Sequence, residues 1–397
     1  MTNSIKNLSL ATDLFTLSEM QPDKTHRLST LDMLRGAAAF AVLLSHARAY
    51  TLKSYSELSE AGTDIGLMTS FFYAVTSLGH EAVIIFFALS GFLVGGKALR
   101  DLVSQKFSWP QYIVRRMSRL LIVLLPALVA TWLFDLIGLM ITGGTGYDGR
   151  FAPIFNSGPP LDGSLSLSIS TFLGNLAFLQ TIAVPTFGTN SPLWSLANEF
   201  WYYLIFPLIG WVVLAPASLA ARLFGIALLA ALSLTLPWSI LSLGAIWVAG
   251  AVASIISSDA RLSNFLTRTY VRVLALIVLF GGLGASKAAR LNISDLELGL
   301  IVATCLPALA HMPGHGRWYQ CIARSSSEIS YTLYLTHFPL LSLLAFSTLA
   351  PTRLAPNIVG YGVMLGFVTL ALLWAVLLYQ LFESRTDRLY RAVSRLL

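Results

Sequence analysis

The sequence contains few charged residues. Only 11% of its 397 residues are charged, whereas 56% are hydrophobic and the mean hydropathy is +0.72. A soluble globular domain carries about 25% charged residues, because its surface has to be covered with polar side chains. The composition therefore excludes a soluble globular protein of this size.

Cysteines and metal-ligand spacings are also scarce. The two cysteines, Cys305 and Cys321, fall in a predicted membrane span and in a predicted cytoplasmic loop. That placement excludes a disulfide framework, and neither cysteine has the spacing of a metal site. His80-Glu81 does not begin the zinc-binding pattern H-E-x-x-H, because Ile84 stands where the second histidine would be. We expect no metal.

Long apolar runs dominate what is present, and they do not alternate with polar residues as the strands of a membrane barrel would. A helix needs about 20 residues to cross a bilayer, and in lipid its backbone groups have to pair within their own segment. We therefore predict an all-α, polytopic membrane helix bundle with about ten transmembrane helices. The predicted spans are 30–51, 68–96, 119–141, 194–214, 222–237, 239–257, 272–285, 295–310, 329–350 and 358–382.

The excess of positive charge sets the predicted orientation. A net charge of +7 would raise the question of nucleic-acid binding in a soluble protein, but in membrane proteins Lys and Arg collect on the cytoplasmic side. With the N-terminus inside, 19 of these residues fall on the cytoplasmic side, 6 on the outer side and one, Arg35, within the first span. We predict that both termini are cytoplasmic and expect no nucleic-acid partner.

Composition divides the chain into three parts. Residues 1–28 form a polar cytoplasmic tail, residues 29–383 the membrane domain, and residues 384–397 a basic amphipathic tail that we expect to lie on the anionic inner leaflet. The longest outer loop, 142–192, contains the pattern G-x-G-x-x-G at 144–149. A dinucleotide site needs a strand before this pattern and a helix after it, and neither is expected here. A short helix is expected within 168–181.

Ionisable side chains inside the predicted spans are the main functional candidates. Each is costly to bury in a bilayer and is therefore a functional hypothesis, although mutual pairing that only stabilises the bundle is an equally good explanation for any one of them. These residues are Arg35, His46, His80, Glu81, Asp135, Glu199 and His337.

Arg35 and His46 are expected on one face of the first span. They are eleven residues apart, which returns to nearly the same helix face after a rise of roughly 16 Å. A neutral imidazole is a suitable general base near physiological pH, because its pKa lies close to the working pH. A lone histidine is most often a packing residue, but its alignment with an intramembrane arginine makes His46 a better candidate for a functional role.

A second candidate group opens the fourth span at about the level of His46. Glu199 is predicted to orient the imidazole and to stabilise its protonated form. Trp194 and Asn198 precede it, and Trp194 is suited to stacking on a sugar ring, or to anchoring at the membrane interface.

Three arginines and a polar segment complete the set. Arg115, Arg116 and Arg119 share a helix face and are suited either to clamping a phosphate or to ordinary positive-inside anchoring. The ninth span opens with polar side chains that lead through Tyr334 to His337.

Five of these segments, taken in order, resemble the acyltransferase 3 family of integral membrane acyltransferases. The matching segments are Leu31-Asp32-Met33-Leu34-Arg35-Gly36 with His46; Phe86 to Phe92; Arg115 to Arg119 with Pro126; Trp194 to Glu199 with Tyr202, Tyr203 and Pro207; and Ile329 to His337. Ile84-Ile85 departs from the acidic residue that members often carry before the Phe-Phe pair.

The resemblance implies a ten-span fold in a bacterial inner membrane and transfer of an acyl group, usually acetyl from acetyl-CoA, to a hydroxyl of a surface glycan or lipid-linked sugar. It implies that His46 is the catalytic base, and that Arg35, Arg115, Arg116 and Arg119 bind the CoA. We expect acceptor contacts from Trp194, Asn198, His80, Glu81, Tyr334 and His337.

Two other functions stay open at this point. Intramembrane charges also mark substrate paths in transporters, so a transporter or flippase for a glycan precursor is the main alternative, although the chain lacks the two related halves that many transporters show. The second alternative is a non-catalytic membrane subunit. The acceptor, the acyl chain and the oligomeric state are not predicted.

Overall fold

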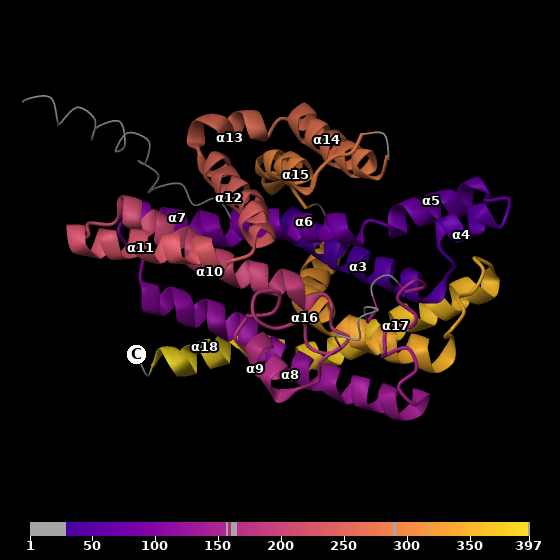
Figure 1. Ribbon diagram of the computed structural model, residues 1–397. Coiled ribbons are helices and arrows are strands. Elements are labelled where there is room, and N and C mark those ends of the chain that lie inside the picture. The colour runs from indigo at the N-terminus through magenta and orange to yellow at the C-terminus, as the bar shows by residue number, and fades with distance from the viewer. Residues whose placement is uncertain (1–28, 156–157, 160–164, 289–290, 315, 396–397) are drawn as a thin grey trace, which may run out of the picture.

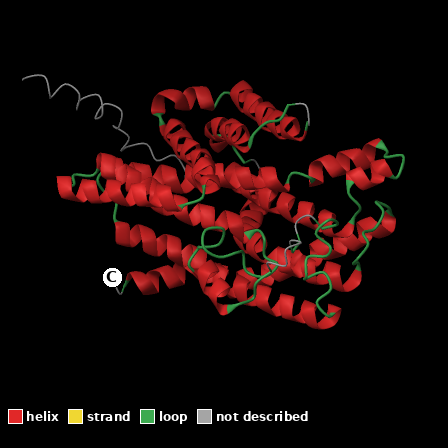
Figure 2. Cartoon of the chain, in the orientation of Figure 1, coloured by secondary structure: helices red, strands yellow, loops and turns green. Residues whose placement is uncertain are grey.

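The computed structural model describes residues 29–155, 158–159, 165–288, 291–314 and 316–395, and it is helical throughout this part of the chain (Figures 1 and 2). The predicted tail at 1–28 lies outside the described residues. The helices are α3 (Ser29–Thr51), α4 (Tyr55–Glu60), α5 (Leu67–Thr76), α6 (Gly79–Ser90), the π-helical turn η1 (Gly91–Gly95), α7 (Gly96–Val103), α8 (Trp109–Thr142), α9 (Ile169–Leu176), α10 (Leu193–Leu214), α11 (Leu219–Thr235), α12 (Trp238–Ser258), α13 (Ala260–Leu266), α14 (Thr269–Lys287), α15 (Asp295–Ala310), α16 (Arg317–Thr348), α17 (Ile358–Leu381), the 3₁₀ turn η2 (Glu383–Arg385) and α18 (Thr386–Ser394).

The prediction of an all-helical fold is confirmed. Nine of the ten predicted spans each fall largely within one helix, whereas the second, 68–96, covers α5, α6 and η1. The number of spans and the orientation of the termini stay predictions. Within the described residues, seven helical segments are long and apolar enough to cross a bilayer. Among the helices outside this set, α11 and α15 are shorter, with 17 and 16 residues, and α3 carries charged side chains within its apolar sequence.

Two helices begin well before their predicted spans. Helix α8 starts at Trp109 rather than at 119, with Pro110 in its first turn, although the Ser108 side chain makes no capping hydrogen bond. Helix α16 starts at Arg317 rather than at 329, so the prediction that Cys321 lies in a loop is wrong, and this exposed residue is helical. A 34-residue helix is about 51 Å long, well beyond the hydrocarbon core of a bilayer.

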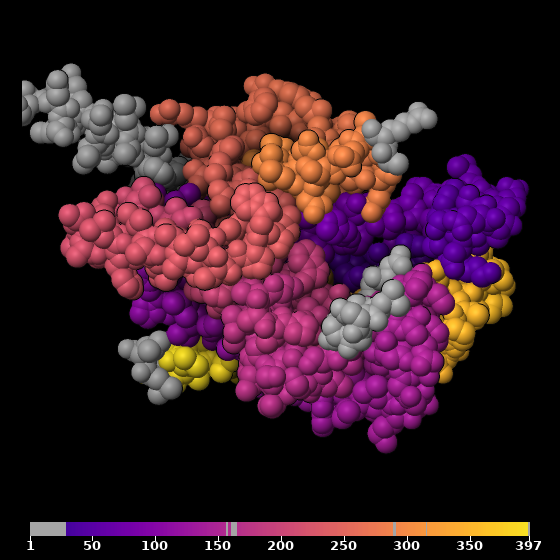
Figure 3. All heavy atoms as spheres, in the orientation of Figure 1, coloured from indigo at the N-terminus to yellow at the C-terminus, as the bar shows by residue number. Residues whose placement is uncertain are grey.

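The bundle has two distinct ends. The α7–α8 connection, the α10–α11 connection and α18 gather at the left in Figure 1, while α4 and α5 lie at the right. We call the left end the basic end, because Arg115, Arg116 and Arg119 lie in the first turns of α8 there. In Figure 3 the indigo N-terminal chain lies recessed between the orange and the magenta segments.

Helix α3 is the central element, and it runs parallel to α16. Asp32 near its start accepts a hydrogen bond from Ser327, and Tyr50 near its end bonds Ser342. Because both pairs advance in the same direction along the two helices, the packed faces stay in one register over five turns. The first and ninth spans of an alternating bundle are expected to be parallel in this way.

The second predicted span is interrupted by a π-helical turn. Helix α6 passes into η1 after Ser90, and the backbone of α12 packs directly against this turn. A Cβ added at Gly91 would lie 1.9 Å from the Trp247 carbonyl oxygen, and one at Gly250 would lie 2.1 Å from the Ala88 carbonyl oxygen. Such π-turns interrupt helices most often at functional sites, and this one fixes the position of Ser90.

We expect Gly91→Ala to destabilise the protein, because the backbone of α12 leaves no room for a methyl group. The expected loss is about 1–3 kcal/mol, as for other overpacked cores, measured by thermal unfolding in detergent. Gly366→Ala on α17 is the matched control, since its Cβ would meet nothing within 4 Å. Equal stability of the two variants would contradict the close packing of α12 on η1.

Candidate active site

The face of α3 that was predicted to carry Arg35 and His46 does pack along one partner, α16. Nδ1 of His46 lies 2.9 Å from Nε2 of His337, and the two rings stack with centroids 5.2 Å apart. His337 is fully buried, whereas His46 is partly exposed. The two predicted histidines therefore form one pair.

The backbone of α16 determines how this pair is protonated. Nδ1 of His337 lies 2.8 Å from the Leu333 carbonyl oxygen, which can only accept, so Nδ1 carries the proton. The Nε2 of neutral His337 is then an acceptor, and His46 donates to it from Nδ1. This chain leaves Nε2 of His46 as the unprotonated, basic nitrogen.

The predicted pairing of Glu199 with His46 is wrong. Glu199 accepts hydrogen bonds from Ser90, at 2.8 Å, and from Tyr203, while the imidazole is held by His337. Ser90 in turn accepts a hydrogen bond from the Trp247 indole at 3.1 Å. Ser90, the last residue of α6 before the π-helical turn, thus links Glu199 to α12 through Trp247.

Three cavities meet at the basic end. We call them the deep cavity, about 320 Å³, the mouth cavity, about 530 Å³, and the side cavity, about 130 Å³. The deep and mouth cavities share Arg35 and Arg119, and Arg116 lines all three. The four predicted arginines, Arg35 and those of α8, therefore line neighbouring cavities.

The mouth cavity is rich in arginine. Five arginines and three acidic residues line it, so positive charge is in excess. Arg119 forms an ion pair at 2.8 Å with Glu383, which also accepts from the backbone and the hydroxyl of Thr332. Arg115 lies over the ring of Tyr390, 4.7 Å from its centroid. Helix α18 thus forms one wall of the cavity.

Apolar side chains make up much of the surface of the deep cavity, and several of its polar groups bond to one another. Besides the Glu199 group it contains Ser195 and Tyr334, whose hydroxyl oxygens are 2.7 Å apart. The Tyr334 ring lies 6.2 Å from that of His337, centroid to centroid. The deep cavity therefore leads from the arginines towards the histidine pair and is separated from it by Tyr334.

The remaining predicted residues bond elsewhere. Trp194 packs edge-on against Phe87, and Asn198 is buried. In the part of the chain that the structure describes, neither lines any of the three cavities. The binding of an acceptor by these two residues stays a prediction.

At the start of α6, His80 forms a hydrogen bond and Glu81 an ion pair. His80 pairs with Asp295 at 2.8 Å, and Glu81 pairs with Lys287 at 2.7 Å. These contacts tie α6 to the α14–α15 connection and give both residues a structural role, and acceptor binding by them stays a prediction.

Asp135 has a structural environment. It is fully buried and accepts from the backbone and the hydroxyl of Thr189. The next residue, Asn190, donates to the Leu335 carbonyl oxygen at 2.9 Å. That oxygen is free because Pro339, four residues on, has no N–H to donate to it. The two bonds fix the segment before α10.

Sequence reasoning missed four residues of these cavities. Ser90 and Tyr203 lie within quoted motifs, and Tyr203 is one helical turn after Glu199. Ser195 lies one turn before Glu199 on the same face. Glu383 directly follows the last apolar run and is 3% exposed, and a carboxylate at that boundary was the available signal.

Comparison with known proteins gives two findings. Residues 28–380 match the family Acyl_transf_3, described as an acyltransferase domain. The chain is also similar to the protein named acyltransferase MdmB from Streptomyces mycarofaciens, with 29% identity over 187 residues, which is 47% of this chain and 40% of that protein. The matched region thus spans less than half of that relative. No solved structure matches the chain.

The two ion pairs of the mouth cavity, Arg119–Glu383 and Arg324–Glu328, should contribute differently to the free energy of unfolding. Glu383→Gln should lower the free energy of unfolding by about 2 kcal/mol, because it removes a carboxylate that is buried between α8 and α16. Glu328→Gln is the control, since its partner Arg324 has an 80% exposed side chain and a surface pair contributes less than about 1 kcal/mol. Thermal unfolding in detergent distinguishes them, and an equal effect would contradict the buried role of Glu383.

Proposed function

This chain belongs to the acyltransferase domain family, and we propose that it moves an acyl group, acetyl in the first instance, from acyl-CoA to a hydroxyl of a cell-surface polysaccharide or lipid-linked sugar. The observation that carries this proposal is a cavity lined by arginines at one end of a helix bundle. It continues into an apolar cavity that ends beside a hydrogen-bonded histidine pair.

The cavities suit an acyl-CoA donor in charge and polarity. The CoA phosphates are anionic, and arginine binds phosphate through paired N–H donors. The pantetheine arm and a short acyl chain are compact and weakly polar, as the deep cavity requires. In this assignment Arg35, Arg116 and Arg119 lie where the phosphates give way to the pantetheine arm.

His46 acts as the general base in the proposed reaction. Its Nε2 takes the proton of the acceptor hydroxyl while the oxygen forms a bond to the thioester carbonyl carbon. The C–S bond then breaks, and the proton passes to the departing thiolate of CoA. His337 is a positioning residue here, because it holds His46 in the tautomer that has a free Nε2. A covalent acyl intermediate on His46 is the alternative route to the same product.

The His46–His337 pair has to approach the thioester for this reaction. Tyr334 stands between the deep cavity and the pair, so a small change in the rotamer of this side chain, or of His46, accompanies transfer.

The proposed topology has ten spans, with the basic end and both termini in the cytoplasm of a bacterial cell and the protein in its inner membrane. The parallel packing of α3 on α16 supports this, since the first and ninth of ten alternating spans run in the same direction. Acyl-CoA then reaches the arginines from the cytoplasm, and an exported glycan approaches from the far side.

His46→Ala should abolish acylation of the surface polysaccharide while the protein still inserts and folds, because no proton acceptor replaces Nε2. The measurement is mass spectrometry of polysaccharide from cells that produce the wild-type chain or the variant, with membrane content checked by immunoblot. Wild-type levels of acylation in the variant would refute the proposed mechanism. Glycan export that is lost together with acylation would favour a transporter instead.

His337→Ala should lower kcat about 10- to 100-fold and leave KM for acyl-CoA unchanged, since it removes the acceptor that orients His46 but touches no donor-binding group. Tyr50→Phe is the control, because it removes another α3–α16 hydrogen bond, to Ser342, without altering the pair. A raised KM with unchanged kcat would show that His337 serves donor binding rather than positioning.

A further inference from the structure

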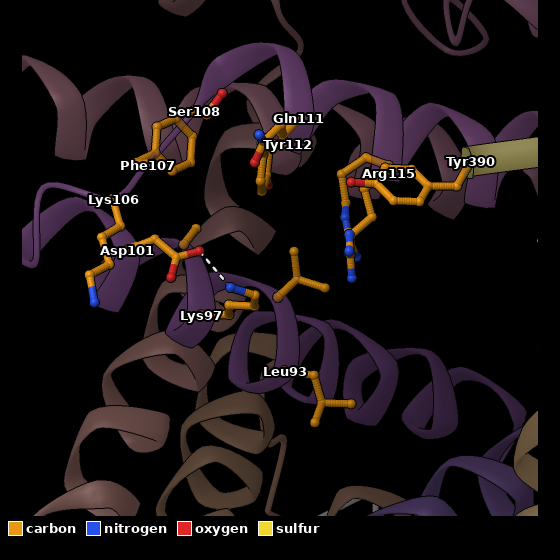
Figure 4. Close-up of a pocket in the computed structure, with 13 residues that line it drawn as sticks. Leu93, Lys97, Asp101, Lys106, Phe107, Ser108, Gln111, Tyr112, Arg115 and Tyr390 are labelled. Carbon is orange, nitrogen blue, oxygen red and sulfur yellow. Dashed lines mark hydrogen bonds and ion pairs between the residues drawn. The ribbon is translucent and has the colours of Figure 1, made fainter. Parts of the chain in front are cut away.

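The side cavity is a separate compartment between the end of the second predicted span and the start of α8. Figure 4 shows Phe107 and Tyr112 on one side of it and Leu93 and Lys97 on the other, with Arg115 and Tyr390 at its edge. It encloses about 130 Å³. The sequence predicted a phosphate clamp at Arg115, Arg116 and Arg119, but it did not predict this cavity.

The walls of the side cavity differ from those of the mouth cavity. Leu93, Val94 and Ala98 form an apolar side, and Phe107 and Tyr112 supply aromatic rings opposite. By contrast, most residues that line the mouth cavity are charged. Aromatic and apolar walls suit a flat heterocycle, whereas clustered guanidinium groups suit phosphate.

Polar groups are placed at the edge of the side cavity. Lys97 and Asp101 form an ion pair at 2.6 Å on one side of the cavity, and the exposed residue Gln111 lines the other side next to Tyr112 (Figure 4). A carboxylate and an amide together offer an acceptor and a donor, which match the amino group and ring nitrogens of a purine base. Lys106 and Arg115 add positive charge beside them.

The three parts of CoA match the three cavities. Arg116 lines all three cavities. In the proposed arrangement the pantetheine arm lies in the deep cavity, and the arginines of the mouth cavity bind the diphosphate. We propose that the side cavity binds the adenine base of the donor, with Tyr112 and Phe107 forming the aromatic wall and Lys106 near the 3′-phosphate of the ribose. This inference rests on the proposed acyl-CoA donor and adds a nucleobase subsite to it.

Binding of CoA and of 4′-phosphopantetheine, which lacks the adenosine and two of the three phosphates, tests this subsite. Both ligands are titrated calorimetrically into the full-length protein in nanodiscs. Tyr112→Leu should weaken CoA binding about tenfold, since stacking of a base on an aromatic ring is lost. It should leave the affinity for 4′-phosphopantetheine unchanged. Trp132→Leu, an exposed aromatic residue on the same helix, is the control and should change neither affinity.

A second variant keeps the test independent of the packing around Tyr112. Gln111 is exposed on the cavity lining, so Gln111→Trp should fill the cavity without disturbing the fold, and Gln111→Ala is its matched control. We expect the tryptophan to weaken CoA binding at least tenfold, again with 4′-phosphopantetheine unaffected.

The outcomes separate this inference from the function on which it rests. If the wild-type protein binds CoA and neither Tyr112→Leu nor Gln111→Trp changes the affinity for CoA, the adenine subsite is refuted, but acyl-CoA remains the proposed donor. Equal wild-type affinity for CoA and 4′-phosphopantetheine also refutes the subsite. If Gln111→Trp instead abolishes stabilisation by phosphatidylglycerol and leaves CoA binding intact, the cavity holds a lipid headgroup. If wild-type protein binds no CoA, the proposed function itself fails.

Discussion

The parallel packing of α3 on α16 is the constraint on which the site depends. A hydrogen bond from Ser327 to Asp32 near the start of α3 and one between Tyr50 and Ser342 near its end hold the two helices in one register. This register places His46 beside His337 and Arg35 beside the Ser327 carbonyl oxygen. A histidine pair inside a membrane protein is costly unless its polar atoms are bonded. Here the Leu333 carbonyl oxygen satisfies the far end of the pair, and it also determines which nitrogen of His46 is basic.

The proposed donor-binding arginines and the proposed catalytic histidine pair lie at different levels along the helix axis. The arginines cluster at the basic end, in the first turns of α8 and near the start of α3. His46 lies about three turns further along α3, beside His337 of α16. Arg116 joins the cavities, and Tyr334 marks the boundary with the histidine pair. This separation is what an enzyme needs if donor and acceptor approach from opposite sides of a membrane.

The sequence predicts the parts of this arrangement that lie within one helix. The apolar runs predict that the chain is helical, and the eleven-residue spacing predicts that Arg35 and His46 share a face, because both follow from helix geometry. Contacts between helices were predicted less well. Glu199 was assigned to His46 because the two were expected at the same level in the membrane, but Ser90 of α6 and Tyr203, one turn further along α10, bond to this carboxylate instead.

The remaining misses have the same physical cause. Glu383 lies beyond the last apolar run and is buried only because η2 turns it back towards Arg119 and Thr332. The start of α16 at Arg317 was missed because a helix that leaves the bilayer becomes polar and loses the apolar signal. In both cases tertiary packing, rather than local composition, decides where the residue lies.

The measurement that tests the central claim most directly uses inverted membrane vesicles from cells that produce this chain and its natural glycan. Acetyl-CoA labelled in the acetyl group is supplied outside, which the basic end faces in the proposed topology, and the glycan inside the vesicles is analysed for label. Transfer across the membrane through the arginine-lined cavities predicts label in the enclosed glycan, with CoA released outside. Labelling that occurs only after the vesicles are opened, so that acetyl-CoA reaches the inner face, would contradict the account.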